Sequence, residues 1–201
     1  MSAPTRKRRM RDESQKQLVD ATLAAIYEHG FHEATAARIA AHAGLSAGNI
    51  HYHFGSKEEL FVAAMRQLMS GLGEELVDAL AKTDTARDRV AAILHANLSD
   101  SFFTHQNCFV WLQFWSETAR SEELARLERI NALRFRRNLL DALVQIMDRP
   151  KAERLARELV AMVDGLWIRK AQVADALSPD AARQTVSAYL DRRLRGLAIG
   201  G

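Results

Sequence analysis

The 201-residue sequence lacks the features that mark secreted and membrane proteins. Its one cysteine, Cys108, cannot form a disulfide within the chain, which suits a reducing cytoplasm. No apolar run approaches the roughly 20 residues needed to span a bilayer, so we expect no membrane partner. The basic N-terminus is followed by Asp12, Glu13 and Gln15 rather than an apolar core, so we expect no secretory signal. These absences predict a cytoplasmic protein.

Residues that interrupt helices are also scarce. The chain has only 3 prolines and 10 glycines, and strand-like alternation of apolar and polar residues is nowhere sustained. The hydrophobic fraction of 48% is ordinary for a globular protein, and the length is ample for a core. The sequence therefore predicts an all-α fold. Its net charge of +3 is compatible with a nucleic-acid partner but does not demonstrate one.

The most informative segment is residues 35–60, which reads TAARIAAHAGLSAGNIHYHFGSKEEL. Thr35 can cap a short helix, because its hydroxyl can accept a hydrogen bond from a free backbone donor of the first turn. Gly44 suits the left-handed position just after a helix end, and Ser46 stands where a second N-cap is needed. Two short helices joined by a tight turn that contains glycine predict a helix-turn-helix. The alternative is three small helices packed together in any α-protein.

The second of these helices predicts a surface for DNA. Ile50 and Phe54 should point inward, which leaves the small and polar residues facing out. Asn49 offers a donor and an acceptor together, which matches the edge of adenine in the major groove. Ser56 and Glu59 have the spacing of a capping box, which places the next helix firmly. The predicted DNA-contacting residues are Thr35, Arg38, Ser46, Ala47, Gly48, Asn49, His51, Tyr52, His53 and Lys57.

This segment resembles the DNA-binding module of the TetR family of transcriptional repressors. The matching positions are Thr35, Ile39 with Ala40, Ala43 to Ser46, Ile50 to Phe54, and Lys57 to Leu60. Many members carry tyrosine where this chain has His51. The resemblance implies a one-component repressor that binds double-stranded operator DNA and responds to a small-molecule effector.

We expect two parts in the chain. Residues 1–60 form a DNA-binding head with three helices, and residues 61–201 form a helical ligand-binding and dimerisation domain. The head begins with a basic arm that could lie along phosphates or enter the minor groove, or could be a solvated tail. The cationic residues of this arm are Arg6, Lys7, Arg8, Arg9 and Arg11.

Two long helices, predicted over about 122–147 and 152–177, carry broad apolar stripes. Such helices can pair with their symmetry mates in a four-helix bundle. Alternatively, both stripes are fully buried inside one subunit. The TetR resemblance implies a homodimer that uses these helices. A two-fold axis would let two recognition helices read both halves of a palindrome.

A candidate ligand site combines aromatic residues with one carboxylate. Trp111, Phe114 and Trp115 share a face at helical spacing, and Asp164 lies three residues before Trp167. Aromatic faces with a carboxylate suit a quaternary ammonium ion, which has no N–H to donate and binds by cation–π attraction. The alternative is ordinary core packing, which aromatic pairs at this spacing commonly provide.

The run WLQFW, the segment from Arg126 to Leu139 and the motif DGLWIR resemble the BetI group of the same family. That resemblance implies a repressor of glycine betaine synthesis genes that senses choline. The alternative is a TetR-type repressor of an efflux or catabolic gene with another apolar or cationic effector.

Enzymatic and metal-binding chemistry find little support in the sequence. No nucleophile–base pair or glycine-rich phosphate loop is present, so we expect no enzyme and no cofactor. His51 and His53 should point to opposite sides of a helix, and His105 with Cys108 lacks an evident third ligand. We therefore predict no metal site.

Overall fold

The computed structural model describes the backbone of residues 6–198 and the side chains of residues 11–195. Within this range every regular element is an α-helix, which confirms the predicted fold class. None of the described helices is long and apolar enough to cross a membrane. The helices are α1 (Arg6–Glu33), α2 (Ala36–His42), α3 (Ala47–Phe54), α4 (Lys57–Leu80), α5 (Ala86–Ala96), α6 (His105–Glu117), α7 (Glu122–Leu143), α8 (Arg149–Gln172) and α9 (Pro179–Ala198).

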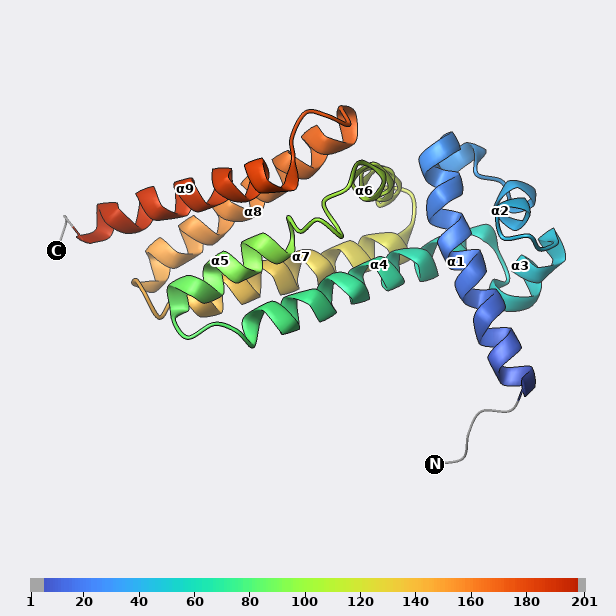
Figure 1. Ribbon diagram of the computed structural model, residues 1–201, viewed down its shortest axis with the longest axis horizontal. Coiled ribbons are helices and arrows are strands. Elements are labelled where there is room, and N and C mark those ends of the chain that lie inside the picture. The colour runs from blue at the N-terminus through green and yellow to red at the C-terminus, as the bar shows by residue number, and fades with distance from the viewer. Residues whose placement is uncertain (1–5, 199–201) are drawn as a thin grey trace.

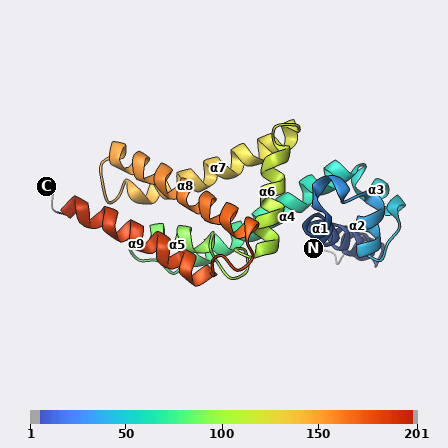
Figure 2. The ribbon, with the colours of Figure 1, turned by 90° about the horizontal axis from the view of Figure 1, so that it is seen from above.

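The helices form a small group and a larger one (Figure 1). Helices α1, α2 and α3 lie together at one end, where α2 packs against α1 and α3 packs against α2 and the start of α4; we call α1 to α3 the head. Helix α4 runs from the head into a bundle that also contains α5 to α9, and α6 crosses this bundle near the head (Figure 2). Because α4 is one helix from Lys57 to Leu80, it passes through the expected domain boundary at residue 60 without a break.

Side-chain caps place the helices of the head. The Thr35 hydroxyl accepts a hydrogen bond from the Arg38 backbone at 3.3 Å, and the Ser56 hydroxyl accepts one from Glu59 at 3.0 Å. Ser46 takes the extended conformation of an N-cap. Gly44 has a φ of 66°, a conformation that a residue with a Cβ rarely adopts. The predicted caps and the helix-turn-helix are therefore confirmed.

The predicted basic arm is wrong for residues 6–11, which form the first turns of α1. Charged residues with long side chains favour the helix, and no glycine or proline interrupts the chain between residues 6 and 29. The rest of the expected arm, residues 1–5, lies outside the described residues. Helix α1 is broken at Gly30, whose φ of 77° and ψ of 164° are not helical.

The two long helices end before the predicted residues, at Leu143 and Gln172, and α8 begins at Arg149, earlier than predicted. Much of their apolar surface is used inside the chain. Leu155, Leu159 and Val163 of α8 are buried in the core together with Leu139 and Leu143 of α7. Other residues of the predicted stripes stay accessible: Ile130 and Leu133 of α7 are exposed, as is Val173 just after α8. Part of each stripe is therefore buried in the core of the monomer, and part remains accessible.

Candidate functional site

Helix α3 presents its polar side chains outward, as a recognition helix would. Ile50 is fully buried, Phe54 is partly buried, and Tyr52 is 68% exposed. Gly48 and His51 are also exposed, whereas Ala47 and Asn49 are half-buried. Of the six predicted contact residues on α3, Gly48, His51 and Tyr52 are therefore exposed, and the other three are half-buried.

Asn49 has a structural role in capping α3 that the sequence did not predict. Its Oδ1 accepts hydrogen bonds from the Ser46 backbone N–H at 3.2 Å and from the Ser46 hydroxyl at 2.7 Å. The expected bidentate contact with adenine needs that same oxygen as an acceptor. In this conformation Asn49 can offer its amide N–H groups to a base or a phosphate, while its oxygen holds the N-terminus of α3.

His51 and Lys57 are held by backbone carbonyls. The His51 Nδ1 lies 2.8 Å from the Gly55 carbonyl oxygen, so this nitrogen carries the proton and Nε2 faces away. The Lys57 ammonium donates to the Phe31 carbonyl at 3.1 Å and lies 4.5 Å from the centre of the Phe31 ring. Lys57 therefore ties α4 to α1, in addition to its predicted role at DNA phosphates.

His53 differs from the outward orientation that the sequence predicted. Its side chain is half-buried, and among the described residues no group hydrogen bonds to its Nδ1. Burial lowers the pKa of His53, and the charge of Arg11 adds to this effect. A neutral, half-buried imidazole is a poor phosphate ligand. Arg11 also lies 6.0 Å from the centre of the exposed Tyr52 ring, so the start of α1 borders the face of α3.

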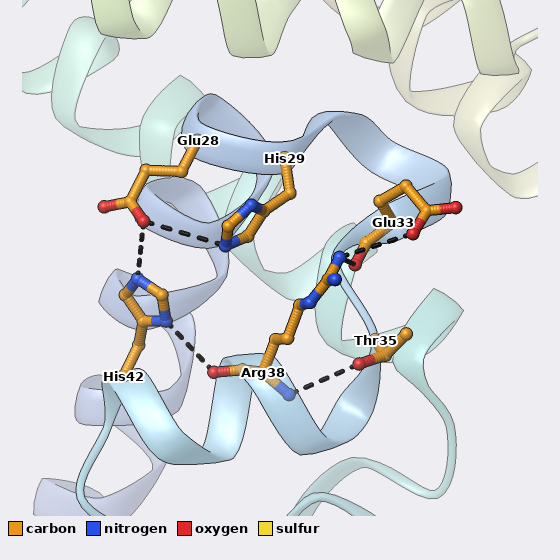
Figure 3. Close-up of polar contacts among 6 residues, drawn as sticks. All are labelled: Glu28, His29, Glu33, Thr35, Arg38 and His42. Carbon is orange, nitrogen blue, oxygen red and sulfur yellow. Dashed lines mark hydrogen bonds and ion pairs between the residues drawn. The ribbon is translucent and has the colours of Figure 1, made fainter.

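Arg38 and Thr35 lie at the turn between α1 and α2 (Figure 3). The Arg38 guanidinium donates to the Glu33 backbone carbonyl at 2.7 Å and pairs with the Glu33 carboxylate at 3.3 Å. Both Arg38 and Thr35 remain exposed. Both side chains are accessible to DNA, but a phosphate would have to displace Glu33 to pair with the Arg38 guanidinium.

The predicted ligand residues meet in the larger bundle. The ring centres of Trp111 and Trp167 are 5.3 Å apart, and those of Trp111 and Trp115 are 6.4 Å apart, both in edge-to-face geometry. These three side chains and Asp164 line one cavity, which we call the indole pocket. Phe114 is the exception: it is fully buried behind Trp111 and does not line the cavity, because it faces the core.

The indole pocket contains a second carboxyl group that sequence reasoning missed. Glu128 of α7 lines the cavity, and the Trp115 indole hydrogen bonds to its carboxyl. Its Oε2 is buried, and within the described part of the chain no hydrogen-bond partner reaches it. In the sequence Glu128 stands beside the apolar stripe residues Leu124 and Leu127, and this pattern alone does not identify the pocket.

Burial changes the acidity of both carboxyl groups. The pKa of Glu128 is raised to about 7, mainly by desolvation; the hydrogen bond from Trp115 acts against this rise, and the nearby charge of Asp164 adds to it. Desolvation alone raises the pKa of Asp164 to about 6. Neither carboxyl group has an ion-pair partner among the described residues, so burial opposes the ionised form of both. A cation in the pocket would supply that partner.

Five elements enclose the indole pocket, which has about 440 Å³ of empty space, part of it open to solvent. Leu72 comes from α4, Asn97 from the end of α5, and Phe135 from α7, while α6 and α8 supply the tryptophans. Leu72, Asn97 and Phe135 also line a wider groove between α4 and α7. A ligand in this pocket would therefore touch the helix that carries the head.

Comparison with known proteins identifies the chain. The family model "Bacterial regulatory proteins, tetR family" matches residues 18–64, and the model "BetI-type transcriptional repressor, C-terminal" matches residues 86–195. This chain belongs to the TetR family, in its BetI-type branch. It is a ligand-responsive DNA-binding transcriptional repressor and not an enzyme.

Individual relatives agree over nearly the whole length. The HTH-type transcriptional regulator BetI of Brucella anthropi is 40% identical over 181 residues, which cover 90% of this chain and 93% of that protein. A crystal structure of a transcriptional regulator from a Rhodococcus species has a TM-score of 0.79 at 27% identity and covers 90% of this chain and 96% of that one. A Saccharomonospora viridis protein, described as a transcriptional regulator in complex with choline, has a TM-score of 0.80 at 24% identity, with 90% and 96% coverage.

Proposed function

We propose that this repressor senses choline, or a closely related quaternary ammonium ion, in the indole pocket and controls genes of glycine betaine synthesis. The observation that carries the proposal is the buried Glu128 oxygen, which no described residue reaches with a hydrogen bond and which lies in a cavity lined by three tryptophans. The BetI name of the Brucella anthropi relative and the choline bound to the Saccharomonospora viridis protein support the same effector class.

The chemistry of the pocket fits a cation that has no N–H. The methyl groups of a quaternary ammonium ion carry its charge and can pack against the faces of Trp111, Trp115 and Trp167. Each such contact contributes about 0.5–2 kcal/mol, so three rings give an affinity in the micromolar to millimolar range. Glu128 and Asp164 add formal negative charge close by, because both line the same cavity.

The structure offers a route from the pocket to the head. Leu72 lies on α4, whose N-terminal turn is held against Phe31 by Lys57. Trp111 and Trp115 lie on α6, which packs against α1. In our proposal choline favours an arrangement of the heads that no longer fits the operator. It can do so only through a difference in affinity for the two arrangements.

We also propose a homodimer that acts on a palindromic operator in the cytoplasm, with α3 of each head in the major groove. After the core is packed, α8 keeps an exposed line of small and apolar residues: Ala161, Gly165 and Ile168, spaced by four and three positions. This outer face of α8, with α9 beside it, is the surface that we assign to the second copy.

Calorimetry with choline, together with operator binding, tests this function. We expect one choline per subunit, quenching of tryptophan fluorescence, and weaker binding to a palindromic duplex from beside the repressor's own gene. Trp115→Ala should weaken choline binding far more than Trp115→Phe, which keeps an aromatic face. The uncharged analogue with carbon in place of nitrogen should bind much less than choline.

Failure of choline would not remove the repressor assignment. If choline at millimolar concentration gives no heat and no change in operator affinity, the effector is another apolar or cationic molecule. The groove between α4 and α7, with Met69, Leu76 and Ile130 in its wall, would then be the place for a larger apolar effector.

A further inference from the structure

Two histidines and a glutamate converge on the surface of the head (Figure 3), and none of them lines the indole pocket. Glu28 and His29 lie in the last regular turn of α1 before the break at Gly30, and His42 is the last residue of α2. His42 Nε2 is 3.0 Å from Glu28 Oε2, and His29 Nε2 is 3.7 Å from the same oxygen. The three candidate ligand atoms all lie within 4.8 Å of one another.

These distances match the spacing of ligands around a small metal ion. Zinc binds histidine nitrogen and carboxylate oxygen at about 2.0–2.2 Å in a tetrahedral site, which places neighbouring ligand atoms about 3.3 Å apart. The two measured separations lie on either side of that value. Small rotations of the His29 and Glu28 side chains, which are 34% and 51% exposed, would bring all three atoms onto one ion.

The His42 ring is already oriented as a metal ligand. Its Nδ1 lies 3.0 Å from the Arg38 backbone carbonyl, an oxygen that can only accept a hydrogen bond. Nδ1 therefore donates its proton to this carbonyl. Nε2 donates to Glu28 when the ring is protonated and carries the lone pair once the ring is neutral. Histidines that bind metals commonly donate their other ring N–H to a carbonyl in this way.

We propose that Glu28, His29 and His42 form a site for a divalent ion of the zinc class, which links α1 to α2 in the head. Two imidazole nitrogens and one carboxylate favour zinc or a neighbouring transition metal over magnesium and calcium, which prefer oxygen ligands. The ligands are solvent-accessible, so water completes the coordination. This site is independent of the choline proposal, because none of its residues lines the indole pocket.

A proton competes with the metal for His42. The hydrogen bond to the Arg38 carbonyl raises the pKa of His42, and the Glu28 carboxylate raises it further, while burial acts in the opposite direction. The nearby charged groups Arg38 and Glu33 are paired with each other. Zinc binds the neutral form of this ring, through the lone pair of Nε2.

Other histidine and cysteine groups of the described chain offer less. His105 hydrogen bonds to the Tyr27 hydroxyl at 2.9 Å. Cys108 is 1% exposed, and burial raises the pKa of its thiol to about 12, so it does not supply a thiolate. Within the described residues, the cluster of Glu28, His29 and His42 is therefore the strong candidate for zinc, which makes the measured stoichiometry informative.

The test is calorimetric titration of untagged, metal-free protein with zinc chloride, supported by NMR of the histidine rings. We expect one zinc ion per chain, a higher melting temperature, and zinc-dependent shifts of the His29 and His42 ring signals. Glu28→Gln, His29→Gln and His42→Gln should each weaken binding by about ten-fold or more. His32→Gln, which removes a histidine from outside the cluster, should bind zinc like the unchanged chain.

The NMR measurement uses the unchanged protein, so it remains decisive if a variant folds poorly. Zinc binding that leaves the His29 and His42 signals in place would overturn the proposal. So would an unchanged affinity in the three glutamine variants, or the absence of binding at pH 8 with tens of micromolar zinc. The choline and operator measurements are separate, so failure here would leave the repressor assignment intact.

Discussion

The Phe31 backbone N–H donates to the Gln113 side-chain oxygen at 3.2 Å, across the boundary between the head and the bundle. Gln113 lies on the face of α6 that contacts α1, together with His105 and Glu117. His105 hydrogen bonds to Tyr27 of α1, and Glu117 pairs with His32 of α1 at 3.2 Å. The other side of α6 carries Trp111 and Trp115 of the indole pocket. One helix therefore contacts both the effector site and the head.

This arrangement predicts that Gln113→Ala weakens communication while both binding sites persist. The substitution removes the acceptor for the Phe31 N–H and leaves the pocket lining unchanged. Operator affinity with and without saturating choline gives the coupling, which we expect to fall by about 0.5–2 kcal/mol. Gln145→Ala, an exposed glutamine at the end of α7, is the matched control. An unchanged ratio of the two affinities in Gln113→Ala would show that α6 does not transmit the signal.

Glu128 predicts a pH dependence of choline binding. In the free protein its pKa of about 7 leaves much of the carboxyl protonated at neutral pH, whereas a bound cation favours the carboxylate. Binding therefore releases protons, and the affinity for choline should rise from pH 5.5 to 8. Glu128→Gln should weaken binding at pH 8 and flatten the upper part of this profile. Calorimetry in two buffers with different ionisation enthalpies counts the protons released.

The same carboxyl group should make the ligand-free protein less stable at high pH, where Glu128 is ionised. The pKa of Glu128 is raised in the folded state, so its favourable contribution is complete below about pH 4.5 and is lost as the pH rises through about 7. Glu128→Gln should therefore stabilise the ligand-free protein at pH 8, by about 1–3 kcal/mol. Glu122→Gln, whose side chain is 86% exposed on the same helix, should change neither property. A lower melting temperature for Glu128→Gln at pH 8 would contradict this account.

Local features of the fold could be predicted from the sequence because their causes are local. Thr35, Ser46 and Gly44 act through hydrogen bonds and backbone angles within a few residues, so short-range patterns identify them. The position of Asp164 and Trp167 on one face of a helix is likewise a matter of spacing. The separation of head and bundle followed from the resemblance to a family whose motifs occupy consecutive segments.

Features that depend on distant contacts could not be predicted. Glu128 joins the indole pocket only because α7 packs beside α6 and α8, and no pattern within α7 specifies that neighbour. The attachment of Lys57 to Phe31 links residues 26 positions apart. Phe114 and Trp115 are neighbours in the sequence, yet the packing of α6 sends one into the core and the other to the pocket.

Asn49 predicts two separable effects on operator binding. Asn49→Ala removes the amide that can contact a base, which should relax preference at one position in each half-site by about 1–3 kcal/mol. It also removes the acceptor for Ser46, which should lower the melting temperature. Ser46→Ala disturbs the same cap while it keeps the Asn49 amide, so it should weaken all operators equally. If Asn49→Ala also weakens every operator equally, Asn49 acts only as a cap.

Gly165 allows a test of the dimer that does not endanger the monomer. This glycine lies within α8, and a Cβ added there would meet no other atom of the described chain within 4 Å. Replacement of a glycine inside a helix by arginine favours the helix by roughly 0.5–1 kcal/mol, so Gly165→Arg should fold at least as well as the unchanged chain. The long cation would stand between two copies that approach each other along the outer face of α8. We therefore expect this variant to sediment as a monomer at micromolar concentration and to lose affinity for the full palindrome, because the second head no longer contributes.

Gly73→Arg is the matched control for this test, because Gly73 is also exposed within a helix and has open space around it. On α4 it lies outside the proposed interface, so this variant should remain dimeric. A monomeric Gly165→Arg with an unchanged circular dichroism spectrum places the contact on α8. If that variant sediments like the unchanged chain, the two copies meet through another surface, and an unchanged chain that is itself monomeric would exclude the homodimer.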